Sequence, residues 1–250
     1  MSPWTLRYDK SCGNVGQLAA DLLISTLELP PLGSLHHASL LPAAGAAAFA
    51  HAPGLLSFGL ELFADPARKL ACLQQRAPAA PGRQVELAQA TAAWIVQSGF
   101  KQVWVLGSLD AVFRSDGQLG GPQLRYWSPE AAALSEACER QGLRALEPEW
   151  FQRAGDKPLA ERLLPPWPLL RELQAAGVAC AALLTFSLEG DNRPEACMLA
   201  GVAAGALGLA GPAAAPQELG VARGAAGSIA WREPSSWDFA FGRSDRFEAY

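Results

Sequence analysis

One stretch of this sequence decides the expected fold: Gly13-Asn14-Val15-Gly16-Gln17-Leu18-Ala19-Ala20-Asp21-Leu22-Leu23-Ile24-Ser25-Thr26-Leu27. Six of its residues recur at helical spacing and form a mostly apolar face wide enough to pack on a sheet, namely Val15, Leu18, Ala19, Leu22, Leu23 and Thr26. Asn14 is a good N-cap residue, and Gln17 follows at the spacing of a capping box. Pro30 and Pro31 stop the helix, because neither can donate a backbone hydrogen bond.

Gly16 is an unexpected residue in the first turn of this helix, because glycine there costs roughly 1 kcal/mol relative to alanine. Two interpretations explain it. A phosphate or carboxylate could bind the free N–H groups of the helix start, or the strand-to-helix turn could be tight. The G-x-x-G pattern lacks the full dinucleotide fingerprint, so the tight turn is the favoured interpretation.

The first half of the chain contains a strand at Trp4 to Tyr8 and a short strand at Leu35 to Leu41. Apolar and polar residues then alternate from Leu56 to Leu62, which is the pattern of a half-buried strand. Asp65 to Arg68 form a turn, and Lys69 to Gln75 return as the second strand of an antiparallel hairpin.

Helices and strands then follow one another along the chain. Helices are expected at 85–96 (closed by Gly99), 129–141 and 169–176, and strands at 102–106, 124–127, 178–186 and 229–231. The strand at 178–186 enters another helix through Glu189-Gly190-Asp191-Asn192, with Pro194 in the first turn and Asn192 and Glu195 as a second capping box. These units predict a three-layer α/β/α sandwich, with a mostly parallel central sheet and an added antiparallel hairpin. We expect a single α/β domain over 1–241 and a flexible C-terminal tail over 242–250.

Composition excludes several classes of protein. The 250 residues carry a net charge of −4 and no run of basic residues, which argues against a nucleic-acid binder. The five widely spaced cysteines suit reduced thiols in the cytosol, and the three histidines lack partners at metal-ligand spacing. The uncharged stretch 196–215 is mostly alanine and glycine, so a helix buried in a soluble protein is favoured over a membrane span.

No set of residues passes the test for an active site. The acidic residues near expected turns or helix starts at the sheet edge, where open α/β folds bind ligands, are Asp21, Asp110, Glu189 and Asp191. Ser108 lacks the surrounding pattern of a nucleophile elbow. We therefore expect no enzyme, no cofactor and no metal. Four tryptophans lie in irregular segments, where they either anchor an interface or fold loops onto the body: Trp150, Trp167, Trp231 and Trp237.

Three blocks of residues resemble the proteasome assembly chaperone 2 family. They are Gly13 to Leu27, Leu183 to Ala196, and Pro234-Ser235-Ser236-Trp237 followed by Phe241-Gly242, in the family's order. Prolines at 165–168 replace a glycine-rich loop of the family. The resemblance implies a layered α/β fold and a heterodimer with proteasome assembly chaperone 1 that binds free α-subunits of the 20S proteasome. It also implies promotion of α-ring formation, prevention of α-ring pairing, and a location in the cytoplasm and nucleus.

The C-terminus provides candidate partner-binding residues. Chain ends that dock into the proteasome α-ring resemble a hydrophobic-Tyr-X terminus; here Phe247, Ala249 and Tyr250 are the candidates, with the tyrosine one place late. A disordered end with no role is the alternative for this tail. The alternative function is a small-molecule enzyme of nucleoside-phosphorylase-like architecture that binds an anion at the two helix N-termini. A closed cleft between those helices would argue against it.

Overall fold

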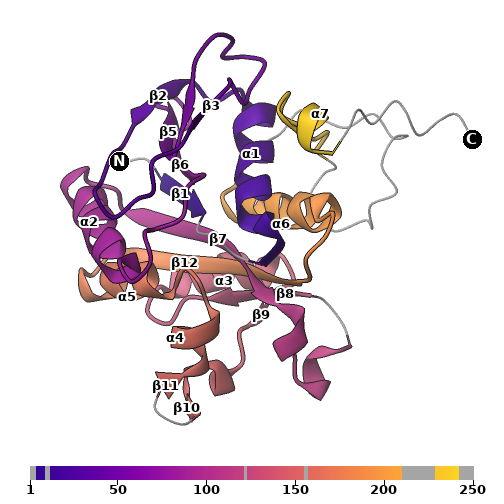
Figure 1. The fold of residues 1–250 in the computed structure, drawn as a ribbon. Coiled ribbons are helices and arrows are strands. Elements are labelled where there is room, and N and C mark those ends of the chain that lie inside the picture. The colour runs from indigo at the N-terminus through magenta and orange to yellow at the C-terminus, as the bar shows by residue number, and fades with distance from the viewer. Residues whose placement is uncertain (1–3, 9–11, 121–122, 155–156, 210–228, 242–250) are drawn as a thin grey trace, which may run out of the picture.

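The fold is built around an eight-stranded sheet with helices on both faces, as a computed structural model of the chain shows (Figure 1). The structure describes residues 4–8, 12–120, 123–154, 157–209 and 229–241. In spatial order the strands are β2 (Pro31–Ser34), β5 (Leu60–Asp65), β6 (Leu70–Gln75), β1 (Trp4–Tyr8), β7 (Gln102–Asp110), β12 (Ala179–Ser187), β8 (Leu124–Trp127) and β9 (Arg144–Ala145). Two small hairpins lie outside the sheet, β3 (Ala44–Gly45) with β4 (Ser57–Phe58) and β10 (Arg153–Ala154) with β11 (Lys157–Pro158).

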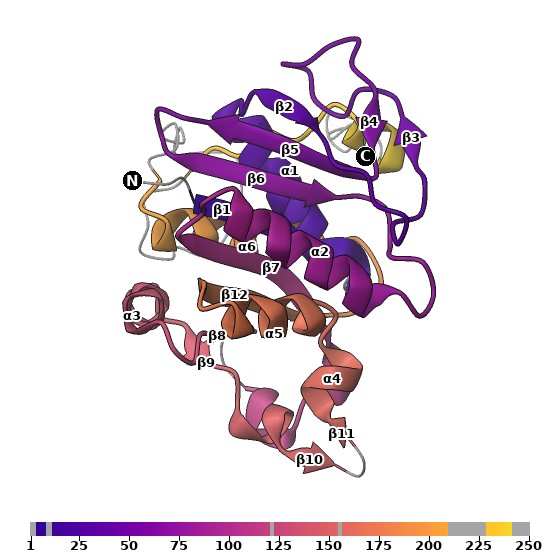
Figure 2. The ribbon, with the colours of Figure 1, turned by 90° about the vertical axis from the view of Figure 1, so that its left-hand side faces the viewer.

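The helices form two layers that enclose the sheet (Figure 2). One layer contains α1 (Val15–Leu27), α3 (Ala132–Arg140), α6 (Arg193–Ala206) and the short α7 (Trp237–Ala240). The other contains α2 (Gln84–Gln97), α4 (Leu159–Leu163) and α5 (Trp167–Ala175). Each layer has its own apolar core against the sheet, because neighbouring residues of β7 and β12 point to opposite faces: Trp104 and Leu183 to one, Val105 and Leu184 to the other.

Strand directions confirm the predicted three-layer α/β/α sandwich. The four central strands β6, β1, β7 and β12 are mutually parallel, and β5 and β6 form the added antiparallel hairpin. The strands flanking this centre are mixed, since β8 runs antiparallel to β12 and β2 antiparallel to β5. Helix α1 packs over β7 and beside α6, so the stretch that predicted the fold occupies the middle of one layer.

Two short strands predicted from sequence are wrong. The expected strand from Leu35 to Leu41 is absent; the chain pairs earlier, as β2, because an edge strand can begin with a proline whose missing N–H is not needed. Ile229 to Trp231 form no strand of the described sheets. That segment lies along α1 instead, where the backbone N–H of Arg232 donates to Thr26 Oγ1 at 2.9 Å.

Residues 196–206 of the small-residue stretch lie in helix α6, as expected for a buried helix, and residues 210–215 lie outside the described residues. The α6 face of Ala196, Leu199, Ala200, Ala203 and Ala204 is buried in the core shared with α1. Among the described residues no helix is long and apolar enough to cross a membrane. The expected tail at 242–250 lies outside the described residues.

Candidate interaction face

The three blocks that carry the family resemblance come together on one side of the sheet. Helix α1 holds the first block, the loop from β12 into α6 holds the second, and the segment around α7 holds the third. Figure 1 shows α1, α6 and α7 beside one another on the same side of the sheet. Segments more than 200 residues apart in sequence are joined there, as in the bond from Ser25 Oγ to the carbonyl oxygen of Glu233 at 3.5 Å.

Asn192 links the starts of α1 and α6. Its side-chain amide lies 2.9 Å from the carbonyl oxygen of Leu188, 3.2 Å from that of Gly190 and 3.3 Å from that of Gly13, and donates to these acceptors. Gly13 is left-handed, with φ +64°, and a Cβ built there would lie 2.0 Å from Asn192 Nδ2. Glycine is therefore required at position 13 by both its backbone conformation and its neighbour.

Both predicted capping boxes are wrong. Asn14 is itself left-handed, with φ 54°, and its side chain makes no cap hydrogen bond to α1. Asn192 makes no cap hydrogen bond to α6 either, because its amide group is turned toward the loop carbonyls. Gly13 is thus the position in this turn that cannot carry a side chain. Gly16 is buried in the first turn of α1, which fits the tight-turn interpretation.

The chain's own carboxylates lie at the two helix starts where an anion would bind. Glu189 Oε1 accepts from the Gly13 N–H at 3.4 Å, and Asp191 forms an ion pair with Arg193 at 2.7 Å. The Arg193 side chain holds the pKa of Asp191 below its ordinary value. Asn192, only 5% exposed, lies between the two helix starts and bonds to both loops. The acidic side chains at these helix starts oppose the alternative of an anion-binding enzyme.

A buried charge cluster lies at the middle of α1. Arg76 Nε donates to Glu61 Oε2 at 2.8 Å, and Arg76 Nη2 donates to Asp21 Oδ1 at 2.9 Å. Asp21 also accepts from Gln74 Nε2 at 2.7 Å and from Trp237 Nε1 at 3.4 Å. Burial alone lowers the pKa of Arg76, but the two carboxylates outweigh it and hold that pKa above its ordinary value.

The cluster corrects the expectation for Asp21. This residue lies in the second turn of α1 and is 3% exposed, so it does not lie at the ligand-binding edge of the sheet. Asp110 is also separate, since its carboxylate accepts from the Val112 N–H at 2.9 Å. The four acidic residues singled out from sequence thus have different local partners. Asp21 instead links the first block to the third by accepting a hydrogen bond from Trp237 Nε1.

Two of the irregularly placed tryptophans fold segments onto the body. Trp150 and Trp237 are 3% and 4% exposed, so the interface-anchor hypothesis is wrong for both. Trp167 is half-buried and packs edge-on against Trp127 at a ring separation of 5.3 Å. Trp231 is half-buried and packs against the core of α1 and α6.

The described thiols and the serine singled out from sequence are poorly suited to nucleophilic chemistry. Burial raises the pKa of Cys138 to about 12 and those of Cys180 and Cys197 to about 11, which keeps these thiols protonated at neutral pH. Ser108 is 1% exposed within β7. Within the described residues, no group of three or more His, Cys, Asp or Glu side chains could hold a metal ion.

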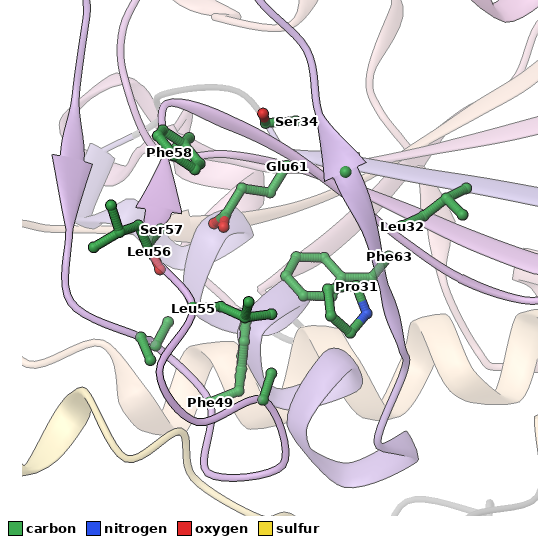
Figure 3. Close-up of a pocket in the computed structure, with 14 residues that line it drawn as sticks. Pro31, Leu32, Ser34, Phe49, Leu55, Leu56, Ser57, Phe58, Glu61 and Phe63 are labelled. Carbon is green, nitrogen blue, oxygen red and sulfur yellow. The ribbon is translucent and has the colours of Figure 1, made fainter.

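An open apolar groove lies at the edge of the sheet beside this face (Figure 3). Its cavity of about 300 Å³ lies between β2 and the segment 47–58, with residues of β5 contributing to the lining. Leu32, Leu55 and Leu56 line it and are 68%, 50% and 60% exposed. Sequence reasoning missed this groove, because the alternation from Leu56 to Leu62 predicts a strand but not which segment lies opposite it. The candidate partner-binding residues Phe247, Ala249 and Tyr250 lie outside the described residues.

Comparison with known proteins identifies the family. The family model described as "PAC2 family" matches residues 10–222. The chain is 36% identical over 201 residues to Proteasome assembly chaperone 2 of Nematostella vectensis, covering 76% of this chain and 82% of that protein. The chain belongs to the PAC2 family. Proteasome assembly chaperone 2 of Danio rerio is 34% identical over 243 residues, which cover 93% of this chain and 88% of that protein.

Solved structures share the PAC2 fold. Pyrococcus furiosus PbaA, described as an archaeal homolog of proteasome-assembly chaperone, aligns with a TM-score of 0.61 at 18% identity. The alignment covers 84% of this chain and 82% of that one. The layered sheet is therefore a property of the family fold, and the junctions at Asn192 and Asp21 show how this member joins its parts.

Proposed function

We propose that this chain is a non-enzymatic chaperone for assembly of the 20S proteasome. It acts as a heterodimer with proteasome assembly chaperone 1, promotes formation of the α-ring and prevents α-rings from pairing with one another off-pathway. We place it in the cytoplasm and the nucleus. The relatives named Proteasome assembly chaperone 2, at 36% and 34% identity over most of the chain, support this role.

One structural observation supports a binding role over a catalytic one. The blocks shared with the family join α1, α6 and the segment 229–241, and the two helix starts between them carry Asn192 and acidic side chains. These residues are used in contacts that hold the fold together, which supports a binding role for the surface around them.

The test is reconstitution from purified components. The chain is co-expressed with proteasome assembly chaperone 1 and mixed with recombinant α-subunits, and the products are separated on native gels and weighed by native mass spectrometry. We expect a one-to-one heterodimer and a higher yield of single α-rings than either chaperone gives alone. Failure of the two chains to form a heterodimer, or an unchanged balance of single and paired α-rings, would contradict the proposal.

We further propose that the C-terminal tail docks into the α-ring. Tyr250 supplies an aromatic ring and the terminal carboxylate, and Phe247 packs at the rim of the pocket, with Ala249 between the ring and the rest of the tail. Deleting 247–250 should weaken α-ring binding while the partner chaperone stays bound. The matched control is Arg243→Ala, which changes the same tail but keeps those four residues. Equal α-ring affinity with and without residues 247–250 would refute tail docking.

A further inference from the structure

We propose that the groove between β2 and the segment 47–58 binds the partner chaperone, through a large apolar side chain that lies next to a lysine or arginine. The inference rests on the proposed heterodimer and adds to it the surface used and the chemistry of the segment bound. Aliphatic walls, an acidic residue among them and the anchoring of one wall support it.

Exposed leucine side chains are concentrated on the walls of the groove. Leu32, Leu55 and Leu56 are all at least half exposed and line one cavity. Leu32 occupies a bulge, because Pro31 pairs with Phe63 and Gly33 with Leu62, which leaves Leu32 without an opposite residue. Bulges re-aim side chains. Here the exposed side chain is leucine, which suits burial against a partner.

The same features make this edge a poor template for an added strand. Pro31 lacks an N–H, the bulge interrupts the ladder, and β2 has only four residues. Recognition through side chains therefore fits this groove better than extension of the sheet by a partner strand.

The charge cluster behind the groove has more carboxylates than cations, which gives the groove its polar preference. Glu61 lines the cavity, and in Figure 3 its carboxylate ends between Phe58 and Phe63. Among the described residues, Arg76 is the one cation that forms ion pairs with Glu61 and Asp21. Two carboxylates share one guanidinium, so the cluster keeps one negative charge. A lysine or arginine beside the apolar anchor would complement it.

One wall of the groove is anchored to the body at Ala48 and Phe49. The carbonyl oxygen of Ala48 accepts from the Ser236 N–H and from Ser235 Oγ, each at 3.2 Å. The Phe49 ring packs edge-on against Phe63 at 5.2 Å and lies under the Arg76 guanidinium at 5.4 Å. Anchoring this wall lowers the entropy cost of binding.

The partner chaperone is the occupant that these features favour over an α-subunit. Long-lived interfaces are more apolar than transient ones, and an assembly factor must release its α-subunits once the ring is complete. A second copy of the chain is a competing occupant. So is the chain's own tail, in which Arg246 and Phe247 have the required chemistry.

The experiment measures affinity for the partner chaperone with matched surface variants of the full chain. Leu32→Ser/Leu56→Ser removes exposed groove leucines, and Val112→Ser/Leu119→Ser removes exposed aliphatic side chains elsewhere, where they are 72% and 59% exposed. We expect the groove variant to bind about tenfold or more weakly and the control within about twofold of the unchanged chain. Glu61→Gln should weaken binding and reduce its dependence on salt. Thermal unfolding of each variant checks that the fold is kept.

A photo-crosslinker at position 56 identifies the occupant, with the same group at position 119 as the control. Attachment of the partner chaperone at position 56 supports the inference. Attachment to a second copy, to an α-subunit or to the chain's own residues 242–250 overturns it, as does unchanged affinity of the groove variant. If the unchanged chain binds no partner chaperone at all, the proposed heterodimer fails, and this inference fails with it.

Discussion

Replacing Arg76 with methionine tests whether the buried charge cluster holds the first and third blocks together. The arginine donates to both Asp21 and Glu61, whose side chains are 4% and 10% exposed, and its own side chain is 16% exposed. Methionine keeps most of the volume but leaves both carboxylates without a cation. Removing one partner of a buried ion pair costs about 3–5 kcal/mol.

The structure sets the expected magnitude near the lower end of that range. Asp21 keeps its hydrogen bonds from Gln74 and Trp237, and Glu61 borders a cavity that water can enter. Loss of the cation over the Phe49 ring adds about 0.5–1 kcal/mol. We expect Arg76→Met to lower the free energy of unfolding by about 3–4 kcal/mol, which for a chain of this length lowers the melting temperature by roughly 10 °C.

The assay is urea unfolding followed by tryptophan fluorescence, with two companion variants. Arg68→Met breaks an exposed pair with Asp65 and should cost at most about 0.5 kcal/mol. Adding Asp21→Asn and Glu61→Gln to Arg76→Met should recover at least half of the loss, because the buried charges are then gone. A loss below about 1 kcal/mol for Arg76→Met, or a triple variant less stable than the single one, would refute the reasoning.

Three further predictions concern the fold. Gly16→Val should lower the free energy of unfolding by about 2–3 kcal/mol, because a branched side chain overfills the buried first turn of α1; a normal melting temperature would contradict this. Gly13→Ala should cost about 3 kcal/mol alone but only about 1 kcal/mol beside Asn192→Ala, which removes the group 2.0 Å from the new Cβ; additive losses in a double-mutant cycle would exclude this coupling. Burial and the hydrogen bond to Glu139 raise the pKa of Tyr126 to about 12 in the folded protein. The contribution of Tyr126 to the free energy of unfolding is therefore complete below the pKa of the unfolded chain, near 10, and is lost as the pH rises to about 12. In Tyr126→Phe the decline of unfolding free energy across that window should be shallower by up to about 1.4 kcal/mol per pH unit, as pH-dependent urea titrations would show; parallel declines would contradict it.

Sequence periodicity predicted the elements whose pattern is local. The alternation before Asp65 predicted the hairpin, and the apolar spacing after Gly13 predicted α1, because side-chain directions repeat with a fixed period in a strand or helix. The half-buried strand expected there is wrong in one respect, since Glu61 on its expected open face is only 8% exposed. Short edge elements cannot be found in this way. The strand β2 contains only two apolar residues, Pro31 and the bulged Leu32, so it has no period to detect. It forms because it pairs with β5.

The candidate site was less predictable because its contacts are between distant segments. Asn14 and Asn192 both looked like helix caps, yet the amide of Asn192 is used where two loops touch, which no local pattern encodes. Asp21 gave no sign of its cation, since Arg76 lies 55 residues away. The resemblance to a family marked the right blocks but not what they do physically. The groove left no sequence signal, because it forms only where β2 and the segment 47–58 face each other in the folded chain.

The bond between Asp21 and Trp237 spans 216 residues, and this separation matters while the chain is being made. Synthesis proceeds from the N-terminus at about 5–20 residues per second, so roughly 10–40 s pass between the two residues leaving the peptidyl-transferase centre. During that interval α1 exists without the segment that covers Asp21, Ser25 and Thr26. A segment made more than 200 residues later thus completes the burial of α1, so a nascent chain released before that segment is made would carry an uncovered acidic residue at the centre of this apolar layer.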